Sequence, residues 1–117
     1  MKSFEELVRE AKAEVLEISA DQLNNLLNKR VAMLLIDVRS AEDFVQLKVE
    51  NSVNLPAEML MTHIEILVPK KTMPVVVMGK SEKHAALAAK TIQDLGYTQV
   101  VSLECGFAEF VRSYELK

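Results

Sequence analysis

The unbroken apolar run Val75–Met78 limits the possible fold more than any other stretch of the chain. A run this short and this rich in β-branched residues is typical of a strand that is buried on both faces. An alanine-rich helical period begins at Glu82 and ends at Gly96, a residue type that often follows the last turn of a helix. The pattern therefore predicts a central parallel strand, a short loop beginning at Gly79, and a helix.

A second apolar run, Val31–Val38, predicts another buried strand, with polar residues beginning at its carboxyl end. The other predicted strands are Val15–Ile18, Val53–Leu55 and Gln99–Leu103, and helices are expected to begin near residues 4, 19, 40, 58 and 107. Strands that alternate with helices in this way form right-handed crossovers. The predicted fold class is therefore α/β, an open, mainly parallel sheet of about five strands with helices on both faces.

The length of 117 residues fits one domain, and we expect it to span residues 1–117. Ser3 and Glu6 have the spacing of a capping box, which predicts an amphipathic helix over residues 4 to about 13. Residues 1–14 are thus interpreted as an N-terminal helical extension that packs across the domain or against a partner.

The charge and cysteine content exclude several classes of function. A net charge of −3 argues against nucleic acid or an anionic membrane as the main partner. The single cysteine, Cys105, cannot form an intramolecular disulfide, and His63 and His84 have no partner at ligand spacing, so neither a metal nor another cofactor is expected. The charged N-terminus resembles neither a signal peptide nor a membrane anchor, and a cytoplasmic location is the expectation.

The loop Gly79–His84 is the most informative candidate site, because the free amide groups and dipole of a helix N-terminus favour an anion. Its candidate anion-binding residues are Lys80, Ser81, Lys83 and His84. The alternative is that Ser81 caps the helix, that Glu82 interacts with the helix dipole, and that the lysines are solvated. A loop of this kind usually holds a nucleophile, but this one has no cysteine, and no base in the local sequence obviously activates Ser81.

Five segments follow one another in a characteristic order: LLIDVRSAEDF, VNLP, PVVVMGK, AALAAKTIQDLGYTQVVSL and GF. Together they resemble the single-domain rhodanese family over about Val15 to Tyr114. The matching residues are Asp37, Val38, Arg39, Phe44, Asn54, Pro56 and the turn Leu95–Tyr97. Members of this family are thiosulfate or related sulfurtransferases, which hold sulfur as a persulfide on a cysteine at the start of the loop after the central strand.

The resemblance implies that several active-site positions are changed in this chain. It places Gly79 at the position of the cysteine, and His84 and Ala85 where an arginine and a serine are common. Leu47–Val49 stands where the family has a glycine-histidine-isoleucine stretch, and Cys105–Gly106 replaces a double glycine. Asp37 and Arg39 match the family and are interpreted as residues that hold the neighbouring loops.

The sequence therefore predicts a rhodanese-like domain that is catalytically inactive and that acts as a binding or regulatory module for a protein partner or a small anion. Glycine has no side chain that could accept a sulfur atom. One alternative is a sulfurtransferase that uses Cys105 as its thiol, since this residue is expected at the same edge of the sheet as Gly79. A further alternative is a small-anion site in the loop Gly79–His84.

Overall fold

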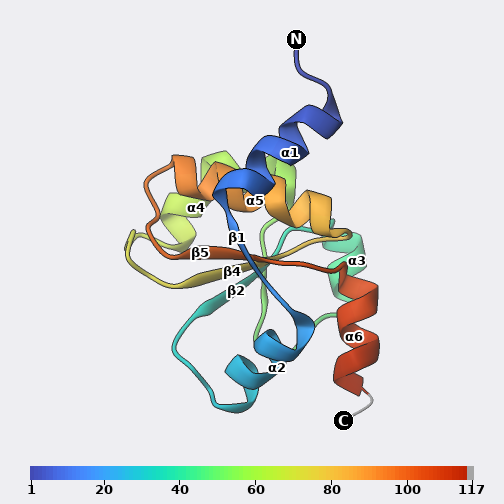
Figure 1. Ribbon diagram of the computed structural model, residues 1–117. Helices are drawn as coiled ribbons and strands as arrows, with labels where there is room; N and C mark the ends of the chain where they lie inside the picture. The colour runs from blue at the N-terminus through green and yellow to red at the C-terminus, as the bar shows by residue number, and fades with distance from the viewer. Residues whose placement is uncertain (116–117) are drawn as a thin grey trace.

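The structure, a computed structural model, describes residues 1–115 and contains a five-stranded sheet (Figure 1). The strands are β1 (Leu16–Ile18), β2 (Leu34–Asp37), β3 (Val53–Asn54), β4 (Val75–Met78) and β5 (Val100–Leu103). Their order is β1-β5-β4-β2-β3, and every neighbouring pair is parallel. The predicted central position of Val75–Met78 is therefore confirmed.

The helices cover both faces of the sheet, which confirms the α/β class. They are α1 (Phe4–Glu14), α2 (Ala20–Asn28), α3 (Ala41–Gln46), α4 (Leu60–Leu67), α5 (Glu82–Asp94) and α6 (Phe107–Glu115). In Figure 1, α1, α4 and α5 lie above the sheet and α2 lies below it, whereas α3 and α6 are close to the right-hand ends of the strands. These right-hand ends are the carboxyl ends of the parallel strands, where ligands of such folds bind.

Two element boundaries differ from the sequence prediction by more than one residue. The second strand begins at Leu34 rather than Val31, because Val31 is still bonded to the end of α2. Its amide donates to the carbonyl oxygen of Leu26 at 3.1 Å, and the preceding Arg30 has a φ of 52°. The helix expected from residue 58 begins with the 3-10 turn Ala57–Met59 and becomes α-helical at Leu60.

Alternating strand residues build one apolar cluster on each face of the sheet. Ile36, Val75 and Val77 face α4 and α5, whereas Leu35 and Val76 face α2 and α6. Because the side chains of a strand alternate between faces, burial of both sets explains why β2 and β4 contain unbroken apolar runs.

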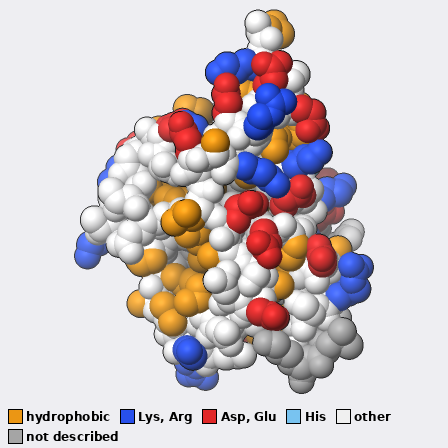
Figure 2. Space-filling view, in the orientation of Figure 1, with side chains coloured by type: hydrophobic (Ala, Val, Ile, Leu, Met, Phe, Trp, Pro, Cys, Tyr) orange, Lys and Arg blue, Asp and Glu red, His pale blue; other side chains and the backbone are white. Residues whose placement is uncertain are grey.

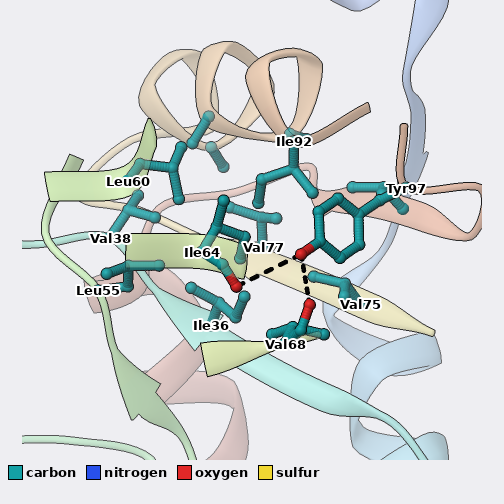
Figure 3. Packing of buried hydrophobic residues seen from close by; sticks show 14 of the residues in the cluster. Ile36, Val38, Leu55, Leu60, Ile64, Val68, Val75, Val77, Ile92 and Tyr97 are labelled. Atoms are coloured by element: carbon teal, nitrogen blue, oxygen red, sulfur yellow. Dashed lines mark hydrogen bonds between the residues drawn. The ribbon is translucent and has the colours of Figure 1, made fainter. Parts of the chain in front are cut away.

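Tyr97 fixes the turn after α5 to the end of α4 (Figure 3). Its hydroxyl donates to the carbonyl oxygen of Val68 and lies 3.4 Å from that of Ile64. The side chain is 2% exposed, and burial raises the pKa of its hydroxyl above the usual value. The hydroxyl is therefore a donor that satisfies buried carbonyl groups, which gives a structural reason for a tyrosine in the turn Leu95–Tyr97.

The N-terminal helix α1 lies against α5. Val8 and Ala11 are buried in the contact, and Figure 2 shows charged side chains of both signs over α1. Three ion pairs join the helices: Glu5 with Lys83, Lys12 with Glu82, and Glu14 with Lys90, at 3.2, 3.5 and 3.0 Å. The extension thus packs across the domain, which is one of the two placements expected from the sequence.

No helix within residues 1–115 is long and apolar enough to cross a membrane.

Candidate functional site

Gly79 follows β4 directly and opens the loop that leads into α5. The residue is buried, and a Cβ atom built on it would lie 3.1 Å from the amide nitrogen of Ala85 and 3.2 Å from Cβ of His84. Backbone and side-chain atoms therefore surround the space that a side chain at this position would enter. The loop therefore packs closely around Gly79 and leaves little room for a side chain there.

Ser81 is the N-cap of α5. Its Oγ accepts a hydrogen bond from the amide of His84 at 3.3 Å, and Nδ1 of the same histidine lies 2.7 Å from Oγ. The sequence pointed to no base that obviously activates Ser81, but one helical turn brings His84 back to the cap. The Ser-x-x-His spacing was the signal that could have revealed the contact.

The candidate anion-binding residues of the loop do not all face the same space. Lys83 pairs with Glu5 of α1 at 3.2 Å, and its side chain is 41% exposed, so its charge interacts with both the carboxylate and solvent. Lys80 is exposed and, together with His84, lines a cavity of about 330 Å³ above the loop. The structure therefore brings together Lys80, Ser81 and His84 and directs Lys83 toward the N-terminal helix.

Glu82 lies in the first turn of α5 and pairs with Lys12 at 3.5 Å. Desolvation alone would raise the pKa of its carboxyl, but backbone hydrogen bonds in the first turn and the charge of Lys12 outweigh this and lower the pKa. The carboxylate thus interacts with the same amide groups that would attract an anion. This arrangement favours a capped helix over an anion site.

Asp37 and Arg39 form a buried ion pair at the carboxyl end of β2. Their exposed fractions are 0% and 8%, and Nη2 and Nε of the guanidinium donate to Oδ2 at 2.8 and 3.0 Å. The amide of Arg39 also donates to Oδ1 of Asp37 at 2.9 Å. Several charge-assisted hydrogen bonds to one carboxylate make this pair a rigid support.

The same arginine joins three other parts of the site edge. Its Nη2 donates to the carbonyl oxygen of Leu47 at 2.7 Å, and its guanidinium lies 3.3 Å from the ring centroid of Phe107. Asn54 donates to the carbonyl oxygens of Asp37 and Arg39, both at 3.0 Å. These contacts agree with the role expected for Asp37 and Arg39, which is to hold neighbouring loops. The stacking of Arg39 on Phe107 was not predicted, because Phe107 is far away in the sequence.

Cys105 follows β5 and belongs to the apolar cluster on the α2 and α6 face. The residue is 9% exposed. Burial raises the pKa of its thiol to about 11, and the charges of Glu109 and Glu104 act in the same direction. A thiol in such surroundings is protonated near neutral pH, whereas sulfur chemistry requires the thiolate.

The loops after β4 and β5 touch each other at Gly106. The amide of Phe107 donates to the carbonyl oxygen of Gly79 at 2.9 Å. A Cβ atom on Gly106 would come closer to the carbonyl oxygen of Lys80 than Cβ atoms approach in proteins. The backbone of the candidate loop therefore rests on a residue that has to be glycine.

We expect Gly106→Ala to lower the free energy of unfolding by about 1–3 kcal/mol, because the added methyl group forces the Lys80 backbone to move. Urea denaturation measures the loss, and amide NMR shifts should change across residues 79–84. Glu104→Ala, at an exposed neighbour, is the control and should stay within about 0.5 kcal/mol. Unchanged stability together with unchanged loop shifts would show that the two loops are not in contact.

Within residues 1–115, no group of three or more histidine, cysteine, aspartate or glutamate side chains is arranged to hold a metal ion. At this edge Lys80 supplies a positive charge, Glu82 and Asp43 supply negative charges, and Ser81 and His84 supply hydrogen-bonding groups.

Comparison with known proteins identifies similarities over most of the chain. A family model described as a rhodanese-like domain matches residues 19–113. The chain is 30% identical over 99 residues to the adenylyltransferase and sulfurtransferase uba4 of Ogataea parapolymorpha, covering 84% of this chain and 24% of that protein. The chain thus spans about a quarter of that relative's length.

Solved structures share the fold at low sequence identity. A Rhodopseudomonas palustris protein of unknown function, described as a possible tyrosine phosphatase, matches with a TM-score of 0.89 at 20% identity and covers 97% of this chain and 92% of its own. The human single-domain sulfurtransferase matches with a TM-score of 0.72 at 22% identity, with coverages of 82% and 95%. The first match includes the N-terminal part of the chain, which lies outside the family model.

Proposed function

This chain belongs to the rhodanese-like domain family, and we propose that within the family it is a binding or regulatory module that does not transfer sulfur. The observation that supports the proposal is Gly79, which occupies the first position of the loop between β4 and α5. Proteins described as sulfurtransferases occur among the similar sequences and among the similar solved structures. Transfer through a protein-bound persulfide requires a thiolate, and glycine supplies none.

The alternative in which Cys105 acts as the sulfur-carrying thiol has less support. Its side chain is 9% exposed and lies beside the carboxylates of Glu104 and Glu109, so its pKa is raised to about 11. Reactive cysteines have lowered pKa values and lie in accessible, electropositive surroundings.

The small-anion alternative has support only from Lys80 and His84, which line the cavity above the loop. Ser81 already caps α5, and Glu82 adds a negative charge at the same helix end. Both features reduce the attraction of the loop for an anion.

We expect no thiosulfate:cyanide sulfurtransferase activity above the uncatalysed rate, because Gly79 stands at the position of the cysteine and the loop has no thiol to hold a persulfide. Thiocyanate formation measures this, with an active single-domain sulfurtransferase as the positive control. Turnover that disappears in Cys105→Ser would reject the proposal and support the alternative thiol.

The variant Gly79→Cys is expected to restore little activity. A Cβ atom at this position lies 3.1 Å from the amide nitrogen of Ala85, so the loop has to widen before it accepts a cysteine. His84 and Ala85 also stand where an arginine and a serine are common in the family, and Glu82 adds a negative charge where an anion would sit. Strong rescue by this single substitution would show that the rest of the pocket is still suited to sulfur transfer.

A further inference from the structure

Strand β1 lies at one edge of the sheet, and part of its backbone is free to pair. Its neighbour is β5, and the carbonyl oxygen of Ile18 accepts a hydrogen bond from the amide of Glu104 at 2.9 Å. In a parallel pair, residues that bond to the neighbouring strand alternate with residues whose N–H and C=O groups point the other way. Both groups of Glu17 therefore point away from the sheet, and neither has a hydrogen-bond partner among residues 1–115. A free edge of this kind is a template for an added strand.

An apolar groove of about 400 Å³ opens beside β1, at the amino ends of the strands. The residues that line it include Leu16, Leu26, Val31, Met33 and Val101, and none of its described lining residues is charged. Leu16 is 74% exposed. β1 lies in front of the other strands in Figure 1, and Figure 2 shows apolar side chains gathered on this side of the molecule. An added strand could bury an apolar side chain against this surface.

Negative charge predominates on the other face of β1. Because strand side chains alternate between faces, Glu17 points away from the face of Leu16. Nζ of Lys12 lies 3.8 Å from the carboxylate of Glu17 and 3.5 Å from that of Glu82. Glu104, beside the end of β1, is exposed and forms no ion pair within residues 1–115. Three carboxylates are therefore balanced by one ammonium group, and Figure 2 shows acidic side chains next to the apolar ones.

The negative charge argues against a second copy of this chain as the occupant of the edge. If two β1 strands paired antiparallel about Glu17, the two Glu17 side chains would lie directly opposite each other. Like charges in this position destabilise a strand pair, whereas opposite charges stabilise it. The charge of the edge therefore favours a partner strand with a basic residue opposite Glu17.

We infer that β1 binds an extended segment of a partner protein as an antiparallel sixth strand, with a lysine or arginine opposite Glu17 and an apolar residue opposite Leu16. In antiparallel pairing a single residue opposite Glu17 exchanges both hydrogen bonds with it. Alternation then directs the basic side chain to the acidic face and its apolar neighbour to the groove. The inference goes beyond the proposed function, because β5 separates this edge from β4 and its loop, and binding here does not depend on sulfur chemistry.

The test uses a capped pentapeptide with lysine in the centre, leucine on both sides and threonine at both ends. Titration followed by amide NMR should shift the signals of β1 and of the groove. Methylating the central amide nitrogen removes the donor to Glu17 and should weaken binding about tenfold. Replacing the central lysine by glutamate should also weaken binding about tenfold at low salt, and less at high salt. Replacing both leucines by serine should weaken binding, because the groove would lose its apolar contact.

Variants of the protein assign the binding to individual groups. Glu17→Pro removes the free N–H, which an edge strand tolerates, and should abolish binding, whereas Glu17→Gln should weaken it only about threefold. Leu16→Ser should weaken binding, but Ile66→Ser, at a 79% exposed residue of α4, should have no effect. Glu104→Lys should weaken binding about fivefold, whereas Glu58→Lys, in the 3-10 turn before α4, should leave it unchanged.

Absence of shifts with the lysine peptide, shifts confined to residues 79–84, or equal affinity for the N-methylated peptide would overturn the inference. Sedimentation of the protein alone should show a monomer. A dimer that Glu17→Pro dissociates would assign the edge to a second copy and would also overturn the inference. The proposed function fails on a different result, the appearance of sulfur transfer, so missing peptide binding in a protein without sulfurtransferase activity rejects only the added strand.

Discussion

Replacing Arg39 by alanine is expected to lower the free energy of unfolding by about 3–5 kcal/mol, the range found when one partner of a buried ion pair is removed. Asp37 is fully buried, and its carboxylate would lose the guanidinium that contacts both of its oxygens. The carbonyl oxygen of Leu47 would also lose its donor, and the ring of Phe107 would lose the cation above it. Urea denaturation, with the midpoint and the slope fitted separately, measures the loss.

A double variant tests whether the unpaired charge is the cause. Asp37→Leu combined with Arg39→Met removes both charges and should be more stable than Arg39→Ala, although it changes more atoms. Arg39→Lys keeps a positive charge but not the planar fork, so its stability should lie between those of the wild type and Arg39→Ala. A loss below about 1 kcal/mol in Arg39→Ala would show that the pair does not support this edge.

Leu35→Ala is expected to cost about 2–4 kcal/mol, because the truncation leaves a cavity in the core. Leu35 lies in β2 and is 3% exposed, in contact with the cluster formed by α2 and α6. Val76→Ala in β4 removes fewer atoms and should fall at the low end of the range. Denaturant midpoints measure both losses.

Leu16 provides the matched control for these truncations. It lies in the edge strand β1 and is 74% exposed, so Leu16→Ala should change stability by no more than about 0.5 kcal/mol. Equal effects of Leu16→Ala and Leu35→Ala would mean that β2 is not a central strand, and the assigned topology would then be wrong.

Local patterns were sufficient to predict most of the fold. The apolar run Val75–Met78 is short and β-branched, and it forms the central strand, buried on both faces. Ser3 and Ser19 form capping boxes with residues three positions later, so helix starts could be predicted from neighbouring residues alone. The start of the second strand was predicted wrongly, at Val31. This residue is apolar like the strand residues that follow, but it comes directly after a helix and is 44% exposed, and apolar character alone does not reveal the difference.

The candidate site was only partly accessible to sequence reasoning. The position of Asp37 and Arg39 at a strand end is a local feature, and it was predicted. The stacking of Arg39 on Phe107 and the ion pair between Glu5 and Lys83 join residues far apart in the chain, and they depend on how the helices pack. No local pattern contains such information.

The central claim is that this domain does not carry sulfur, and intact-mass spectrometry after incubation with thiosulfate tests it most directly. The account predicts that the wild-type mass stays unchanged, because Gly79 has no thiol and the Cys105 thiol is buried with a pKa of about 11. A gain of one sulfur atom that cyanide removes, and that is absent from Cys105→Ser, would contradict the account.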